Sequence, residues 1–184
     1  MSEGYETYGT LSHEGFPGHL YQHVYYQKTD PHKFRSSIGF MGYTEGWAVN
    51  AQSFAYRFSG IEDEYAAAAL FYEDAFYFFL YSIIDIGVNY YGWTASDIVK
   101  YFKDDMFYEF DKSTASFFAD FLIEMPGTYC AYGLGCSSFM SLEQYAQKQL
   151  GDKFDYVSYH ETLLKNGPLP FNILKTAVDE YIAQ

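Results

Sequence analysis

Positive charge is scarce in this sequence. Its 184 residues include 11 Lys and Arg against 24 Asp and Glu, which gives a formal net charge of −13 at pH 7. Nucleic-acid backbones and anionic membrane surfaces both attract proteins with basic surfaces. We therefore expect no nucleic acid and no membrane among the partners of this protein. Negative charge spread over a surface mainly supports solubility and does not identify a substrate by itself.

Cysteine and long apolar runs are scarce as well. The two cysteines, Cys130 and Cys136, are six residues apart, a spacing that fits neither a paired metal knuckle nor a C-x-x-C redox motif. We expect free thiols, so no oxidising compartment is indicated. The longest apolar run, 75–84, is too short to span a bilayer, and no basic segment of a signal peptide follows Met1. These absences favour a cytoplasmic location, with a leader on a longer parent protein left open.

Aromatic residues, by contrast, are abundant. The sequence has 21 Tyr and 18 Phe, and 49% of its residues are hydrophobic against 19% that are charged. This composition indicates a globular chain, and the length fits a single domain, residues 1–184, with a hydrophobic core. A Tyr ring can pack in a core while its hydroxyl reaches water or a ligand. Two uses of the tyrosines stay open: an aromatic core, or a large polar cleft lined with hydroxyls.

The pattern of apolar residues, caps and breaks predicts an all-α fold of about seven to eight helices. No alternating strand pattern of convincing length occurs. Thr94 and Asp97 form a T-x-x-D capping box, and Gly92 and Gly151 stop the helices before them. The helix at 63–91 is apolar nearly all round, which predicts a central position. The expected helices are residues 11–27 with a break at Pro17-Gly18, 43–58, 63–91, 95–110, 113–125, 129–150, 156–166 and 171–182.

The strongest chemical signal is the segment from His13 to His19, H-E-G-F-P-G-H. Zinc peptidases commonly use H-E-x-x-H, in which two His four residues apart share one helix face and the Glu acts as base. Here the second His is six residues on, about 600° of helix rotation, which would separate the two rings by roughly 120°. Pro17 opens a helix and Gly18 tolerates unusual dihedral angles, so a bulge at these positions would bring His19 back over His13.

A zinc site with three protein ligands needs one more donor, and Glu45 is the best candidate. It lies 26 residues after His19 on the next expected helix, which can pack antiparallel to the first. Gly46 and Ala48 beside it are small and would let these two helices approach closely. Without the two His, Glu45 would be an ordinary solvated Glu near a helix N-terminus.

Two other histidine pairs are weaker alternatives. His19 and His23 have metal-ligand spacing, but no Glu directly follows His19. A second H-E pair starts at His160, but Leu164 stands where the partner His would be needed. We therefore expect His160 to be a capping histidine or a buried, hydrogen-bonded one.

Two motifs carry a resemblance to a known family. The segments 10–22, T-L-S-H-E-G-F-P-G-H-L-Y-Q, and 44–48, T-E-G-W-A, resemble the bacterial family labelled domain of unknown function 885, whose pattern is H-E-x-x-P-G-H-x-x-Q followed by E-G-W-A. The resemblance continues over nearly the whole chain. Further similar segments are 84–89 (I-D-I-G-V-N), 92–94 (G-W-T), 126–135, 150–155 with His160, and 167–170 (G-P-L-P).

This resemblance implies a helical, zincin-like metallopeptidase domain, with carboxypeptidase-type action reported within the family. Members are usually much longer, so the chain resembles only their C-terminal, metal-bearing portion, and the missing N-terminal portion is an expected partner. Members usually carry His at Asn89, Arg at Tyr81, and Tyr and Glu at Asn50 and Gln52. The loss of that His and Arg weakens any inference that this chain binds a substrate carboxylate. Gln52, at i+7 from Glu45, can still hydrogen-bond a metal ligand.

The resulting hypothesis is zinc-dependent hydrolysis of a peptide substrate. His13, His19 and Glu45 would hold the zinc ion, leaving one position for water. Glu14 would accept the proton of that water and return it to the leaving amine. Tyr132 is the candidate donor to the oxyanion, with core packing as its alternative role.

Alternatives to this hypothesis concern the metal and the activity. Two His and one carboxylate also resemble the non-haem iron triad, but only a hydrolase has a required part for Glu14, which favours zinc. Asp85 is expected to orient a ligand His or cap a buried donor rather than bind metal. A second class of function is a catalytically inactive helical fragment, or a peptide-binding domain, that retains a structural metal site.

Overall fold

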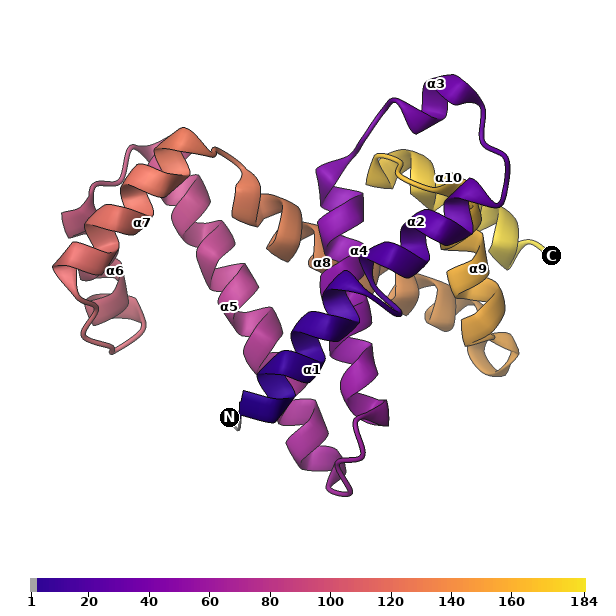
Figure 1. The fold of residues 1–184 in the computed structure, drawn as a ribbon, viewed down its shortest axis with the longest axis horizontal. Coiled ribbons are helices and arrows are strands. Elements are labelled where there is room, and N and C mark those ends of the chain that lie inside the picture. The colour runs from indigo at the N-terminus through magenta and orange to yellow at the C-terminus, as the bar shows by residue number, and fades with distance from the viewer. Residues whose placement is uncertain (1–2) are drawn as a thin grey trace.

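The computed structural model describes residues 3–184, apart from the side chains of Glu3 and Glu64. Over that range its regular secondary structure is entirely helical, which confirms the all-α prediction (Figure 1). The helices are α1 Glu3–Glu14, α2 His19–Gln27, α3 Lys33–Ser36, α4 Met41–Ala55, η1 Tyr56–Phe58, α5 Glu64–Tyr91, α6 Ala95–Asp105, α7 Lys112–Glu124, α8 Thr128–Leu150, η2 Gly151–Lys153, α9 Tyr156–Asn166 and α10 Phe171–Ile182.

All eight expected helical segments are present, with differences at their ends. The first is divided at the Pro17-Gly18 break into α1 and α2. α1 begins at Glu3, well before the expected start at Leu11, because tertiary contacts such as the hydrogen bond from Tyr8 Oη to the Ala55 carbonyl (3.0 Å) order a segment of weak helix propensity. α6 ends at Asp105 instead of residue 110, since Phe107 adopts a φ of 53°, which a right-handed helix does not allow.

Side-chain caps fix several helix starts. Thr94 and Asp97 make the reciprocal capping box that the sequence predicts for α6. Asp63, Asp111 and Asp155 each accept hydrogen bonds from backbone N–H groups of the first turn that follows them. These caps satisfy donors that have no partner inside a helix, and they place negative charge at its positive end.

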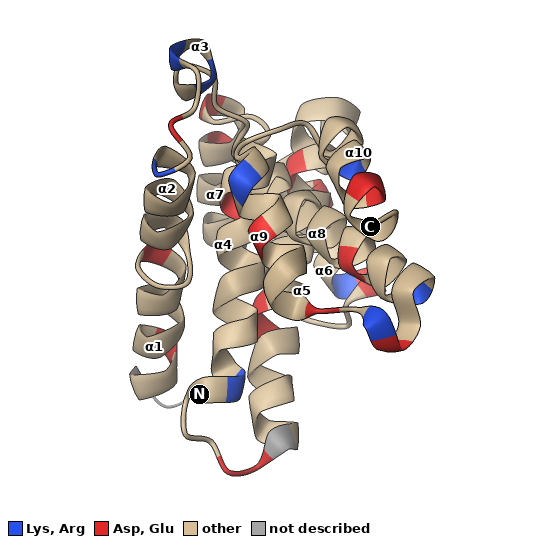
Figure 2. Ribbon diagram, turned by 90° about the vertical axis from the view of Figure 1, so that its right-hand side faces the viewer, with Lys and Arg blue, Asp and Glu red and all other residues tan. Residues whose placement is uncertain are grey.

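The helices pack around two hydrophobic clusters. α4, α8, α9 and α10 enclose one, which includes Tyr43, Phe139 and Tyr159, while α5, α6 and α7 enclose the other around Ile98 and Leu122. The long helices α5 and α8 connect the two clusters, with α6 and α7 lying on one side and α2, α9 and α10 on the other (Figure 1). In the view of Figure 2, Asp and Glu are spread over several helices rather than gathered over one element.

Glycines set the closest helix contact, between α4 and α8. A Cβ atom at Gly46 would collide with the backbone of Gly135, and one at Gly135 would collide with the carbonyl oxygen of Gly42. We expected Gly46 to let the second helix approach the first. That expectation is wrong, because Gly46 faces α8, while α1 packs antiparallel against another side of α4.

α5 is the long apolar helix that the sequence predicts, but it is less buried than a central position implies. Ile84 and Asp85 are buried, whereas Tyr72 is 65% exposed and Phe76 and Tyr77 also face solvent. Among the described residues, Tyr65–Tyr91 is the one helical stretch long and apolar enough to cross a membrane, a test that core helices of soluble proteins also pass. In this fold α5 packs against α4, α7 and α8.

Candidate metal centre

The structure brings the three predicted metal ligands together. Glu45 Oε2, in the first turns of α4, lies 3.6 Å from His13 Nε2 and 3.3 Å from His19 Nε2. The two imidazole rings are edge to face, with centroids 4.8 Å apart and planes at 87°. Two imidazole nitrogens and one carboxylate oxygen therefore point toward one small volume.

A tight link between α1 and α2 makes this convergence possible. The Gly18 N–H donates to the Ser12 carbonyl (2.9 Å), so the chain turns back over the end of α1 before α2 begins. Any Cβ atom at Gly18 would collide with the carbonyl group of His13, which explains why glycine stands there. Trp47 Nε1 donates to the Pro17 carbonyl (3.0 Å) and ties the link to α4.

A chain of hydrogen bonds behind His13 fixes its tautomer. Gln52 Nε2 donates to Asp74 Oδ2 (2.6 Å), so the Gln52 amide oxygen faces His13 Nδ1 at 3.0 Å. An amide oxygen only accepts, so His13 Nδ1 carries a proton, and Nε2 is left as the ring nitrogen that could bind a metal ion. Tyr56 donates a further hydrogen bond to Asp74 (2.8 Å). This role of Gln52 is of the type that the sequence predicts. No sequence pattern pointed to Tyr56, and the one signal for Asp74 was a carboxylate inside the apolar α5.

Charge and burial around Glu45 oppose each other. Burial alone raises the pKa of Glu45, but its contacts with His13 and His19 outweigh this and bring the pKa to about 2. The contact with Glu45 raises the pKa of His19. Glu45 Oε2 is buried and makes no well-formed hydrogen bond with any residue that the structure describes. A buried carboxylate oxygen without a well-formed hydrogen bond is costly, and a cation bound between Glu45 and the two histidines would satisfy it.

Glu14 and Tyr132 flank this centre. Glu14 ends α1 on the exposed side, and its carboxylate lies within 4.8 Å of ligand atoms of His13 and His19. The Tyr132 ring, on α8, stacks between His13 (centroids 6.1 Å apart) and Phe78 (5.2 Å). Burial and the nearby Glu45 carboxylate raise the pKa of Tyr132 to about 12, so its hydroxyl keeps its proton at neutral pH.

The alternative histidine pairs do not form a second centre among the described residues. His23 is exposed on α2, and the His, Cys, Asp and Glu side chains that cluster at metal-binding distances do not include it. His160 packs against Trp47 and Phe54 with ring centroids 5.7 and 6.0 Å away. Burial lowers its pKa. His160 is therefore half-buried among aromatic rings, and it makes no hydrogen bond with a described residue, whereas a capping or a buried, hydrogen-bonded histidine was expected.

Asp85, on α5, caps buried backbone donors at the N-terminus of α8 and is not part of the metal centre. It is 1% exposed and accepts hydrogen bonds from the backbone N–H groups of Gly127 (3.0 Å) and Tyr129 (3.0 Å). Asn89 Nδ2 donates to it as well (2.8 Å) and reaches the Leu122 carbonyl. Of the two roles that the sequence left open for Asp85, the structure shows the cap.

The donor set fits a zinc ion. Zinc sites with three protein ligands combine imidazole nitrogens with a carboxylate and leave a fourth position open. His13, His19 and Glu45 supply that set, and the Gln52 contact behind His13 is the kind of outer hydrogen bond that orients metal-binding histidines.

Two solved structures share this fold. One, described as "the putative lipoprotein from Colwellia psychrerythraea", has a TM-score of 0.78 and 26% identity, and the match covers 95% of this chain and 30% of that one. The other, described as "a putative lipoprotein of unknown function from Shewanella oneidensis", has a TM-score of 0.74 and 21% identity over 91% of this chain and 30% of that one. This chain thus spans about 30% of the length of each structure.

The sequence comparisons place the chain in a family. No curated protein matches the chain significantly. A family model does match, and it covers almost the whole chain, including the segments that supply His13, His19 and Glu45. Since the model for "Bacterial protein of unknown function (DUF885)" matches residues 3–178, the chain belongs to this bacterial family.

Proposed function

We propose that this chain is the metal-bearing part of a zinc-dependent peptide hydrolase. The observation that carries the proposal is the buried Glu45 Oε2 atom, which lies between two imidazole nitrogens at 3.3 and 3.6 Å without a well-formed hydrogen bond. His13, His19 and Glu45 would hold the ion. When bound there, zinc would supply Lewis-acid polarisation of a peptide carbonyl and acidify a water molecule.

The remaining side chains have roles that suit amide hydrolysis. Glu14 lies on the exposed side of the centre, where its carboxylate can take a proton from the attacking water and pass it to the leaving amine. The protonated Tyr132 hydroxyl, beside Glu45, can donate a hydrogen bond to the carbonyl oxygen as negative charge develops on it. The peptide would approach from the side on which Glu14 is exposed.

Elemental mass spectrometry and peptide hydrolysis test the proposal together. Two proteins are purified without chelator: this 184-residue chain and the full product of its natural gene. Each should contain about one zinc ion per chain. Glu14→Gln should retain the metal and lose hydrolysis by a factor of about 10² to 10⁴. Glu6→Gln is the matched control, because Glu6 is an exposed carboxylate on the same helix. Unchanged hydrolysis by Glu14→Gln would reject this mechanism.

A peptide-binding domain with a structural metal site is the second candidate. The chain covers only 30% of the solved structures that share its fold, so a substrate-binding wall contributed by another part of a longer protein fits this size difference. Asn89 is bonded to Asp85 and Leu122 and is not available to a substrate carboxylate. Stoichiometric zinc with peptide binding but no hydrolysis in either form would favour this candidate.

The cellular location is proposed from the structural relative. The Colwellia psychrerythraea protein is described as a "putative lipoprotein". This description favours a location outside the cytoplasm over the cytoplasmic location expected from the sequence. Fractionation of cells that express the natural gene from its own start would test this. Recovery in the soluble cytoplasmic fraction would contradict the proposal.

A further inference from the structure

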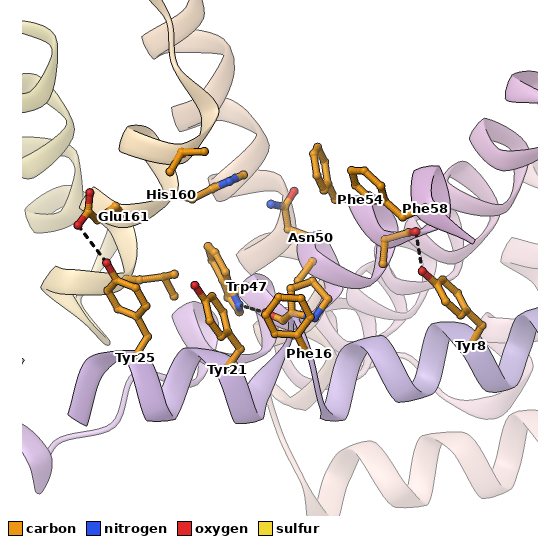
Figure 3. A pocket seen from close by; sticks show the side chains of 15 residues that line it. Tyr8, Phe16, Tyr21, Tyr25, Trp47, Asn50, Phe54, Phe58, His160 and Glu161 are labelled. Atoms are coloured by element: carbon orange, nitrogen blue, oxygen red, sulfur yellow. Dashed lines mark hydrogen bonds between the residues drawn. The ribbon is translucent and has the colours of Figure 1, made fainter. Parts of the chain in front are cut away.

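A pocket lies beside the link that joins His13 to His19, on the other side of α4 from the metal centre. Its volume is about 570 Å³, within the range of ligand pockets in proteins (Figure 3). Trp47, Asn50 and Phe54 line it at helical spacings of three and four. Glu45 and Gln52 face the metal centre. Trp47 follows Glu45 by two residues and Phe54 follows Gln52 by two, and each step of two residues is a rotation of about 200° around the helix. The pocket and the metal centre therefore use opposite faces of one helix.

Aromatic side chains form most of the pocket wall. Phe16 approaches from the link between α1 and α2 and Tyr21 from α2. Trp47, Phe54 and Phe58 approach from the α4 side (Figure 3). Two hydrogen bonds bridge its ends: Tyr25 Oη donates to Glu161 Oε1 (3.2 Å), and Tyr8 Oη donates to the Ala55 carbonyl. These bridges give the pocket a limited length, which suits a compact ligand.

Three polar groups border this apolar space without hydrogen bonds to any described residue. They are the Tyr21 hydroxyl, the Asn50 amide and the His160 imidazole, which come from α2, α4 and α9 and surround the same space (Figure 3). Together they offer donors and acceptors to one ligand. In ligand pockets, a small number of polar groups in an apolar cavity fix the orientation of the bound molecule.

The charge of the lining restricts the ligand further. Among the described residues that line the pocket, Glu161 is the one with a formal charge, and its carboxylate is already paired with Lys165 (2.8 Å) and Tyr25. No Lys or Arg is among these lining residues. An anionic ligand would lose its hydration here without a partner of opposite sign, and a cationic one would have to compete with Lys165 for Glu161.

We propose that this pocket binds an uncharged ligand with an aromatic body and at least one hydrogen-bonding group. The aromatic walls would cover the body, and Tyr21, Asn50 and His160 would bond the polar group. The inference goes beyond the proposed hydrolase function, because the pocket includes no metal ligand and binding needs no metal.

A pair of fluorescent probes tests the proposal on the intact chain in EDTA. N-phenyl-1-naphthylamine is uncharged and has one N–H, whereas 8-anilinonaphthalene-1-sulfonate has the same aromatic framework and an added sulfonate. We expect saturable binding of one uncharged probe per chain, and at least tenfold weaker binding of the sulfonate in 0.5 M salt, where long-range repulsion by the protein is screened. Binding of both probes with equal affinity would overturn the proposal.

Variants locate the bound probe. Asn50→Phe fills the space and should reduce affinity at least tenfold, while Tyr21→Phe removes one hydroxyl and should reduce it by a factor of about 2 to 12. Tyr72→Phe is the matched control, since Tyr72 is an exposed tyrosine on α5 outside the pocket, and should bind as the wild type does. Thermal unfolding identifies any variant that fails to fold. If Asn50→Phe fails to fold, the comparison of Tyr21→Phe with Tyr72→Phe tests the proposal instead. Equal affinity of Tyr21→Phe and Tyr72→Phe would overturn the proposal.

Discussion

Gln52 Nε2 donates a hydrogen bond of 2.6 Å to the Asp74 carboxylate, and this contact determines which end of the Gln52 amide faces the metal centre. With the nitrogen held by Asp74, the oxygen is left for His13 Nδ1 at 3.0 Å. His13 Nε2 then faces the same space as His19 and Glu45 and is the ring nitrogen left for a metal ion. Asp74 on α5 thus orients His13, the proposed metal ligand on α1, without contacting it.

The first prediction concerns Asp74. Asp74→Asn removes the charge that selects the Gln52 orientation, so the amide can turn its nitrogen toward His13 and disfavour the ligand tautomer. We expect zinc affinity to fall by about 10- to 100-fold, as for other outer-sphere partners of metal-binding histidines. Competition with a chromophoric chelator measures it. The neighbouring Glu73→Gln is the control, and equal zinc affinities of the two variants would contradict the role of Asp74.

The second prediction concerns zinc and stability. Because the centre requires the folded chain, zinc at about 100 times its dissociation constant should raise the free energy of unfolding by about 2.7 kcal/mol, and EDTA should remove this gain. His19→Ala should abolish the zinc-dependent gain. His23→Ala, which replaces an exposed histidine of the same helix, should leave it unchanged. A shift of the melting temperature by zinc that persists in His19→Ala would show that the ion binds elsewhere.

The third prediction concerns the contact between α4 and α8. Ala is usually the better helix former, so Gly42→Ala, where an added Cβ meets only ordinary contacts, should be stabilising by up to about 1 kcal/mol. Gly46→Ala, one turn later, places a Cβ against the Gly135 backbone and should be destabilising by about 1 to 3 kcal/mol. Urea unfolding of both variants measures the difference. Similar stability of the two would mean that the helices separate at little cost.

The fourth prediction concerns pH. Burial lowers the pKa of His160, so the unfolded chain binds a proton more readily than the folded one. The stability that this histidine contributes is therefore present above its unfolded pKa of about 6.5 and is lost as the pH falls toward the lower folded value. His160→Gln should be less sensitive to acid than the wild type between these two values. Unfolding in urea at several pH values, with EDTA present, measures this. Parallel curves for the two proteins would contradict the prediction.

Much of the fold follows from local sequence signals. Glycine stops, Asp and Thr caps and apolar periodicity locate most helix ends, because these signals act within one or two turns. The start of α1 and the end of α6 differ from the prediction because they depend on distant packing and on one backbone angle. The burial of α5 was overestimated for a related reason: composition shows how apolar a helix is, but only the tertiary structure shows how many of its faces are covered.

The candidate site divides in the same way. The spacing of His13, Glu14 and His19 and the choice of Glu45 follow from chemistry that residue types reveal. Asp74 escaped prediction because its role depends on α5 crossing behind Gln52, a contact between residues 22 positions apart. The pocket beside Trp47 combines residues from α1 to α9, and no sequence pattern joins them.

The hydrogen bond from Trp47 to the Pro17 carbonyl gives the chain an optical signal of its own. The indole is hydrogen-bonded to the link between α1 and α2, whose conformation brings the two imidazoles together. Trp47 also lies two residues from Glu45 in the sequence. The second tryptophan, Trp93, packs in the other hydrophobic cluster. In a Trp93→Phe background, the emission of one fluorophore should therefore change as zinc is added, and stopped-flow mixing would follow loading of the centre in real time without any label.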